Sequence, residues 1–106
     1  MDCFDSPDKA YMVKYDNLIE MRIGLLVGDI TIFEVCTETQ LMHFKQVVFD
    51  SSPWSSPSII VVPIRFYDGS WFYLHIDVLN TKFAESKNNI TNSINLTDWQ
   101  LYETNS

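Results

Sequence analysis

The sequence predicts an α+β fold that is mainly antiparallel β, with a single sheet of about five or six strands built on hairpins and one short helix near residues 39–48. Two apolar runs meet at Asp68-Gly69 and predict a central hairpin over residues 58–79. Apolar and polar residues alternate before residue 36, and their period becomes helical after residue 37. We expect a single domain over residues 1–106, with frayed termini at about 1–9 and 104–106.

The first third of the chain predicts short strands. Residues 11–15 alternate in polarity, and Asp16-Asn17 predicts a turn after them. Residues 18–27 alternate more clearly, and Gly28-Asp29 predicts a hairpin turn into a further strand over residues 30–36. Gly24, inside its strand, indicates a bulge or a close approach of another backbone segment.

The helix is predicted by a capping box and by the spacing that follows it. Thr37 and Gln40 fit the pattern in which each side chain bonds the other's backbone N–H. The apolar residues after them are Leu41, Met42, Phe44, Val47 and Val48. This spacing predicts a helix of about two to three turns from Thr39 to Val48, although two adjacent valines weaken it.

A loop rich in serine and proline is predicted over residues 50–58, with Trp54 at its centre. A tryptophan there is either an anchor for a partner or a plug over the core, and the plug is the commoner role. At the other end of the chain, residues 80–95 are polar and predict a helical turn near 81–87 before a loop. Residues 94–103 regain strand character.

Asp68-Gly69 sets the register of the central hairpin. An Asp-Gly pair can place both central residues at positive φ, as a type I′ turn requires. With Tyr67 opposite Ser70, alternation predicts these pairs: Phe66 with Trp71, Ile64 with Tyr73, Val62 with His75 and Ile60 with Asp77. Pro63 has no N–H to donate, so its strand should lie at an edge or bulge at that residue.

The two faces of this hairpin are expected to differ. The face predicted to be core carries Ile59, Val61, Phe72, Leu74, Ile76 and Val78. The other face is mixed and carries Trp71, Tyr73, His75 and Asp77. It is either covered by the predicted helix or exposed as a binding surface.

The charge of the chain disfavours two classes of partner. Its formal net charge is −7, from 14 acidic and 7 basic residues, and its basic residues do not cluster. Binding to a phosphate backbone requires clustered Lys and Arg, so direct nucleic-acid binding and adhesion to anionic membranes are both disfavoured. The commoner explanation of the acidity is solubility, and the alternative is attraction to a basic partner.

The remaining composition predicts a cytoplasmic protein. Cys3 and Cys36 are too few and too far apart for a disulfide framework or a zinc site, so they are interpreted as free thiols in a reducing compartment. The acidic N-terminus lacks the pattern of a secretory signal, and no apolar run is long enough to span a membrane. The preference for Asn, and for Lys over Arg, favours a bacterial or phage origin.

No constellation predicts an enzyme, a metal site or a cofactor. His75 and Asp77 share a face and are the best candidates for a base with its orienting carboxylate, but no third group accompanies them. His43 stands alone on the predicted helix, where packing or exposure is commoner than metal ligation. The three glycines are scattered, which excludes a glycine-rich phosphate loop.

The sequence therefore predicts a small acidic protein-binding module that inhibits or neutralises a partner with a basic, nucleic-acid-binding type of surface, as an immunity or anti-defence protein would. The candidate binding residues are Trp54, Trp71, Tyr73, His75, Asp77, Asp29, Glu34, Glu38 and Asp50. One alternative is a structural subunit that forms a homo-oligomer through an edge strand. Another is a small ligand-binding or hydrolytic domain that uses His75 and Asp77.

Overall fold

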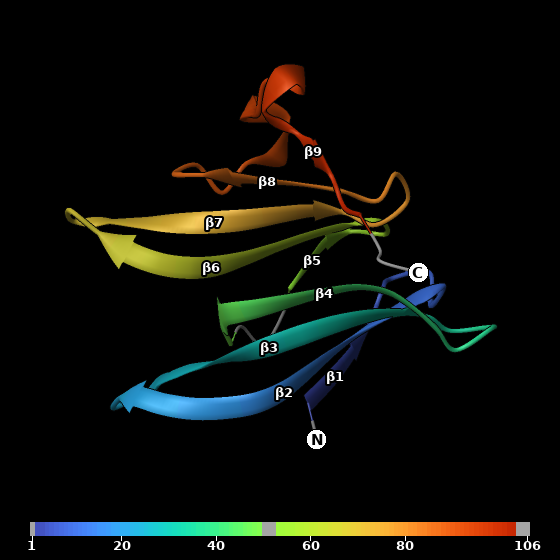
Figure 1. Ribbon diagram of the computed structural model, residues 1–106, viewed down its shortest axis with the longest axis horizontal. Coiled ribbons are helices and arrows are strands. Elements are labelled where there is room, and N and C mark those ends of the chain that lie inside the picture. Colours follow the sequence, from blue (N-terminus) through green and yellow to red (C-terminus); the bar gives the residue numbers. More distant parts are fainter. Residues whose placement is uncertain (1, 50–52, 104–106) are drawn as a thin grey trace.

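The computed structural model describes residues 2–49 and 53–103, which form two antiparallel sheets (Figure 1). The first has the order β1-β2-β3-β4, with β1 at Asp2–Asp5, β2 at Tyr11–Arg22, β3 at Leu25–Glu34 and β4 at Thr39–Val48. The second has the order β5-β6-β7-β8-β9, with β5 at Trp54–Ser56, β6 at Ile59–Tyr67, β7 at Ser70–Asp77, β8 at Lys82–Ser86 and β9 at Gln100–Leu101.

The antiparallel β character that the sequence predicts is confirmed, whereas the single sheet and the α+β class are wrong. The helices within the described residues are two short 3₁₀ turns, η1 at Thr91–Ser93 and η2 at Leu96–Asp98. Neither is long or apolar enough to cross a membrane. Residues 2–5 form an edge strand rather than a frayed terminus, and residues 82–86 form β8 rather than a helical turn.

The predicted helix over residues 39–48 is the strand β4, and its bulges explain the error. The pairs Ile32–Met42 and Phe33–Gln40 leave an extra residue in β4 at Leu41. A second irregularity precedes Val47, where Gln46 has a φ of 59°. Each extra residue shifts the alternation of side chains, so the apolar positions of a bulged strand acquire helix-like spacing.

The β2–β3 hairpin also differs from its prediction. Its turn lies at Ile23 and Gly24, where Gly24 has a φ of 81°, and not at Gly28-Asp29. Asn17 lies inside β2 at a bulge, with a φ of 56°, and not in a turn between two strands. Asn tolerates this left-handed conformation, so the residues that signal a turn can also signal a bulge.

Gly28 lies against the bulge in β2, and it is here that two backbone segments approach closely. A Cβ atom on Gly28 would lie 2.6 Å from the carbonyl oxygen of Asp16 and 2.9 Å from Cδ2 of Leu18. A Cβ on Gly24 would meet nothing within 4 Å. The close approach that the sequence suggests for Gly24 is therefore found at Gly28.

The central hairpin has the predicted turn and a shifted register. Asp68 and Gly69 have φ values of 53° and 78°, and Tyr67 pairs with Ser70, as a type I′ turn requires. Between Pro63 and Arg65 the strand bulges, so that Pro63 pairs with Tyr73 and Ile60 pairs with Ile76. The bulge predicted as one option at Pro63 is confirmed, and the predicted pairs beyond it are wrong by one residue.

This shift decides which side chains of β6 reach the core. Ile60 and Val62 are fully buried, whereas Ile59 and Val61, predicted to be core, are only partly buried. A one-residue slip exchanges the two faces of a strand, which is why the error affects β6 and leaves β7 unchanged. On β7 the prediction that Leu74 and Ile76 are core is confirmed, as it is for Val78 just after the strand, whereas Phe72, also predicted to be core, is only partly buried.

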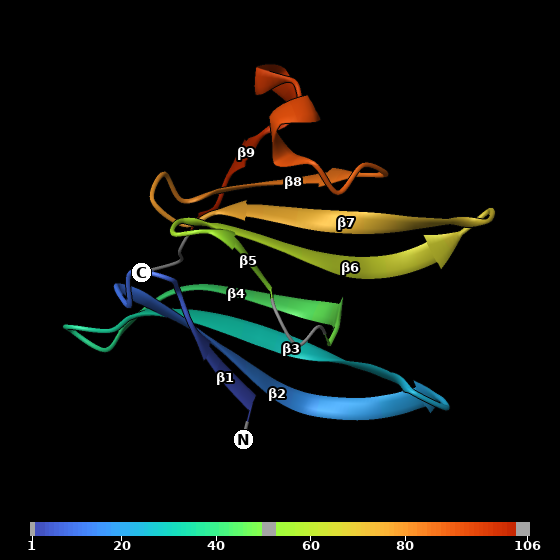
Figure 2. The same cartoon turned by 180° about the vertical axis from the view of Figure 1, so that it is seen from behind.

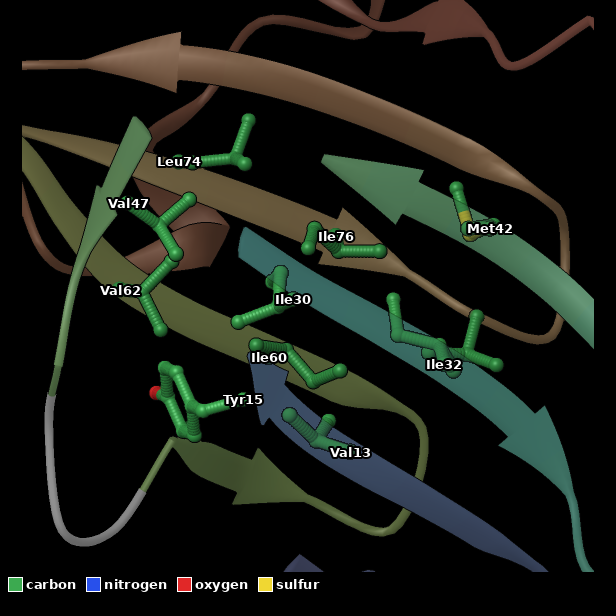
Figure 3. Close-up of a cluster of buried hydrophobic side chains, with 11 residues drawn as sticks. Val13, Tyr15, Ile30, Ile32, Met42, Val47, Ile60, Val62, Leu74 and Ile76 are labelled. Atoms are coloured by element: carbon green, nitrogen blue, oxygen red, sulfur yellow. The ribbon is translucent and has the colours of Figure 1, made fainter. Parts of the chain in front are cut away.

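One core lies between the two sheets and takes side chains from both. Figure 3 shows residues of the first sheet meeting residues of the second, with Val47 of β4 beside Val62 and Leu74. β4 lies next to β6, as both views of the ribbon show (Figures 1 and 2). Aromatic contacts close the margins: the indole N–H of Trp54 donates to the carbonyl oxygen of Phe4 at 2.9 Å, and Phe44 packs against the rings of Phe83 and Tyr102.

The variant Gly28→Ala is expected to lower the free energy of unfolding by about 1–3 kcal/mol, because a methyl group at this position overlaps a backbone carbonyl that cannot rotate away. The control is Gly24→Asn, which has open space and keeps a residue type that tolerates positive φ, so it should cost less. Urea denaturation measures both. A smaller loss for Gly28→Ala than for Gly24→Asn would contradict the close approach.

Candidate functional site

One end of the first sheet carries a hollow bordered by carboxylates, which we call the acidic hollow. It has a volume of about 360 Å³ and is lined by Asp5, Met12, Phe33, Glu34, Val35 and Glu38. The turns after β1 and β3 come together here, at the end opposite the tips of the two long hairpins (Figures 1 and 2). A backbone hydrogen bond of 3.0 Å from Val35 N–H to the oxygen of Ala10 joins the two turns.

Strand pairing places the floor of the acidic hollow on the outer face of the first sheet. Asp5 pairs with Met12, and Met12 pairs with Phe33. Their neighbours Val13 and Ile32 are fully buried in the core, so Met12 and Phe33 point the other way. Partly buried apolar side chains thus form a floor beneath three acidic residues.

The carboxylates of the acidic hollow take no part in the ion pairs formed among the described residues, which join Lys14 to Asp16 and Arg65 to Glu85, nor in the 4.0 Å contact of His43 with Asp29. Glu34 is oriented by the hydroxyl of Thr37, which donates to it at 2.8 Å. Glu38 lies on the turn after β3 in the left-handed conformation, with a φ of 57°. The hollow therefore combines negative charge with an apolar floor.

Asp29, another predicted binding residue, lies on the same face but belongs to a separate polar network. Its carboxylate accepts a hydrogen bond of 3.1 Å from Nδ2 of Asn17 and lies 4.0 Å from Nε2 of His43. Nδ1 of His43 is in turn 2.9 Å from the hydroxyl of Thr31. The structure thus brings Glu34 and Glu38 together but leaves Asp29 apart from them, and Asp50 lies outside the described residues.

Trp54 packs into the margin of the molecule rather than standing free. Its ring stacks on Tyr11 with the centroids 6.5 Å apart, and its indole N–H donates a hydrogen bond to the carbonyl oxygen of Phe4. It contacts the core cluster and is only partly exposed. This geometry is that of the plug over the core, which the sequence favours over the free anchor.

His75 is fully buried, on the side of the second sheet away from the shared core. The segment that covers it is residues 88–102, which we call the C-terminal segment, and not β4, the strand predicted to be a helix. Nε2 of His75 lies 2.7 Å from the carbonyl oxygen of Asn88, and Nδ1 lies 2.9 Å from the hydroxyl of Thr91. A carbonyl can only accept, so Nε2 carries the proton, and the neutral ring accepts from Thr91.

The other residues of this face do not join His75 in one site. Asp77 accepts hydrogen bonds from the backbone N–H of Asn80 at 3.1 Å and from its Nδ2 at 2.8 Å. Trp71 contacts Phe66 near the hairpin tip, with ring centroids 5.2 Å apart, and Tyr73 is half-buried. His75 and Asp77 therefore bond different partners and do not form a base with its orienting carboxylate.

Sequence reasoning missed Asp5, Met12, Phe33 and Val35 as parts of a site. The alternation of residues 11–15 already places Met12 opposite Val13, but the pairing that adds Asp5 depends on β1, which has no sequence signal of its own. Within residues 2–49 and 53–103, no cluster of three or more His, Cys, Asp or Glu residues could hold a metal ion.

The free energy of unfolding is expected to fall as the pH drops from about 7 to 5, because burial lowers the pKa of His75 from its ordinary value of 6.5. In the unfolded chain this histidine takes up a proton below about pH 6.5, whereas the folded chain resists it, so stability present above that pH is lost below it. Denaturation at both pH values measures the fall. This loss of unfolding free energy should be smaller in His75→Gln and unchanged in the control His43→Gln. An unchanged loss in His75→Gln would show that His75 is not its source.

The chain matches no protein-family model, no curated protein and no solved structure. Its function must therefore be argued from the residues that the fold brings together. Among the residues predicted to bind a partner, Glu34 and Glu38 are the two that line one hollow with unpaired charge.

Proposed function

We propose that the protein is a protein-binding module whose acidic hollow receives a basic side chain, with its apolar stem, from a partner protein. The observation that carries the proposal is the placement of Asp5, Glu34 and Glu38 around the floor made by Met12, Phe33 and Val35. Lys and Arg have long apolar stems that end in a charge, so they match a floor of this kind with a rim of carboxylates.

The charge of the whole chain supports the same partner. A net charge of −7 creates a field that attracts a basic surface and raises its rate of association. The same field repels phosphate groups, which makes a nucleic acid an unsuitable ligand. A basic surface that normally binds nucleic acid is the natural target, and its occupation by this protein would inhibit or neutralise the partner.

Fewer acidic residues contact the partner than the sequence suggests. Glu34 and Glu38 remain in it, and Asp5 joins them. Asp29 is engaged by Asn17 and lies near His43, so it contributes to the field rather than to the contact. The contact surface is therefore a local hollow at the end of the first sheet, lined by Asp5, Glu34 and Glu38.

Neutralising the acidic hollow should weaken binding to a synthetic peptide of alternating arginine and leucine by about tenfold, because three exposed charge contacts of about 0.5 kcal/mol each are lost. The variant is Asp5→Asn/Glu34→Gln/Glu38→Gln. Its matched control is Glu20→Gln/Asp68→Asn/Asp98→Asn, which removes the same charge from exposed sites elsewhere. Isothermal titration at low and high salt measures the affinities, and binding to the unaltered protein should weaken with salt.

Two outcomes would overturn the proposal. Equal losses in the two triple variants would mean that net charge alone attracts the peptide, and the solubility explanation of the acidity would stand. An affinity that does not change with salt would exclude the electrostatic contact. Sedimentation of the unaltered protein provides a separate check, because a dimer that the acidic-hollow variant leaves intact would favour association through an edge strand.

A further inference from the structure

A second and larger hollow lies on the other sheet, between its outer face and the C-terminal segment. It has a volume of about 740 Å³, and its wall includes Asp77, Lys82, Thr91 and Trp99. We call it the C-terminal cleft. A volume of this size lies within the range of about 300–1,000 Å³ that is typical of small-molecule sites.

The wall of the C-terminal cleft is fixed to the sheet by a buried side chain. His75 lies beneath it on β7 and bonds both Asn88 and Thr91, which begin the segment that carries the wall. Further along, the N–H of Tyr102 donates to the oxygen of Thr81 at 2.9 Å and returns the chain to the second sheet. The segment between them is therefore held at both ends, and the cleft is a built feature of the fold.

The C-terminal cleft is lined by one acidic and one basic side chain, so their formal charges cancel. These residues are Asp77 on β7 and Lys82 on β8, which pair in register. Asp77 is further fixed by its two hydrogen bonds from Asn80. A neutral ligand suits this arrangement better than an ion, because either charge would be repelled by one of the two groups.

The remaining polar groups of the wall are amides and hydroxyls that hydrogen-bond in both directions. The side chains of Asn89 and Asn92 line the cleft and form no hydrogen bond among the residues that the structure describes. Amides offer both a donor and an acceptor. They match a ligand with several hydroxyl groups, each of which also donates and accepts.

Trp99 adds an aromatic surface to this polar wall. Trp54 and Trp71 each contact another aromatic ring, whereas Trp99 takes part in none of the ring contacts found among the described residues. An indole ring that lacks an aromatic neighbour and borders a polar cleft can cover the apolar face of a ligand ring. A sugar ring is such a ligand, because its C–H groups form an apolar face and its hydroxyl groups surround that face.

We propose that the C-terminal cleft binds a neutral saccharide, which stacks on Trp99 and is hydrogen-bonded by Asp77 and the amides of Asn89 and Asn92. The ligand is either a free sugar or the terminal sugar of a glycan, because both present the same hydroxylated ring. The site is independent of the acidic hollow, which lies on the first sheet. Its failure would leave the proposed protein binding intact.

The probes are glucose, mannose, N-acetylglucosamine and cellobiose, titrated into the ¹⁵N-labelled protein while two-dimensional NMR follows the amides of residues 77–92 and the indole N–H of Trp99. At least one sugar should give saturable shifts with a dissociation constant of about 1 mM or below. Tighter binding of cellobiose than of glucose would identify a glycan end as the source. Equal affinities would identify a free sugar.

Trp99→Ala and Asn92→Ala should each weaken that binding about tenfold, because each removes a contact to the ligand. The matched control is Trp71→Ala, which removes an indole from the hairpin tip and should leave the affinity unchanged. The absence of saturable shifts for all four sugars would overturn the proposal. So would equal losses in Trp99→Ala and Trp71→Ala, or tighter binding of glucuronate or glucosamine than of the neutral sugars.

Discussion

The burial of one apolar core between two sheets is the constraint on which the rest of the structure depends. Neither sheet could hide its inner face alone, since the buried side chains of β2, β3 and β4 meet those of β6 and β7. The bulges at Asn17, Gln46 and Pro63 adjust the alternation of their strands while the inner face stays apolar. Both candidate sites follow from this arrangement, because the residues turned away from the core form them.

The parts of the fold that local chemistry decides could be predicted from the sequence. Asp68-Gly69 specifies its turn, and the alternation along β7 identifies Leu74 and Ile76 as core. Two kinds of prediction failed because a bulge altered the period. β4 acquired a helical pattern, and the pairs beyond Pro63 slipped by one residue, because neither effect of an extra residue is visible without the partner strand.

The candidate sites could be predicted only in part, for a related reason. Glu34 and Glu38 are close in sequence, so their proximity in the acidic hollow needs only the turn between them. Asp5 joins them through the pairing of β1 with β2, which is a tertiary effect. His75 has the chemistry of a functional residue, but the segment that buries it comes later in the chain and carries no periodic signal.

The attachment of the C-terminal segment through His75 couples three properties that are otherwise separate. Protonation of the ring, attachment of the segment and formation of the cleft wall share one set of contacts, to Asn88 and Thr91. By thermodynamic linkage, a ligand that binds only to the form in which His75 is buried and neutral lowers the proton affinity of His75, and protonation of His75 lowers the affinity for that ligand by the same factor.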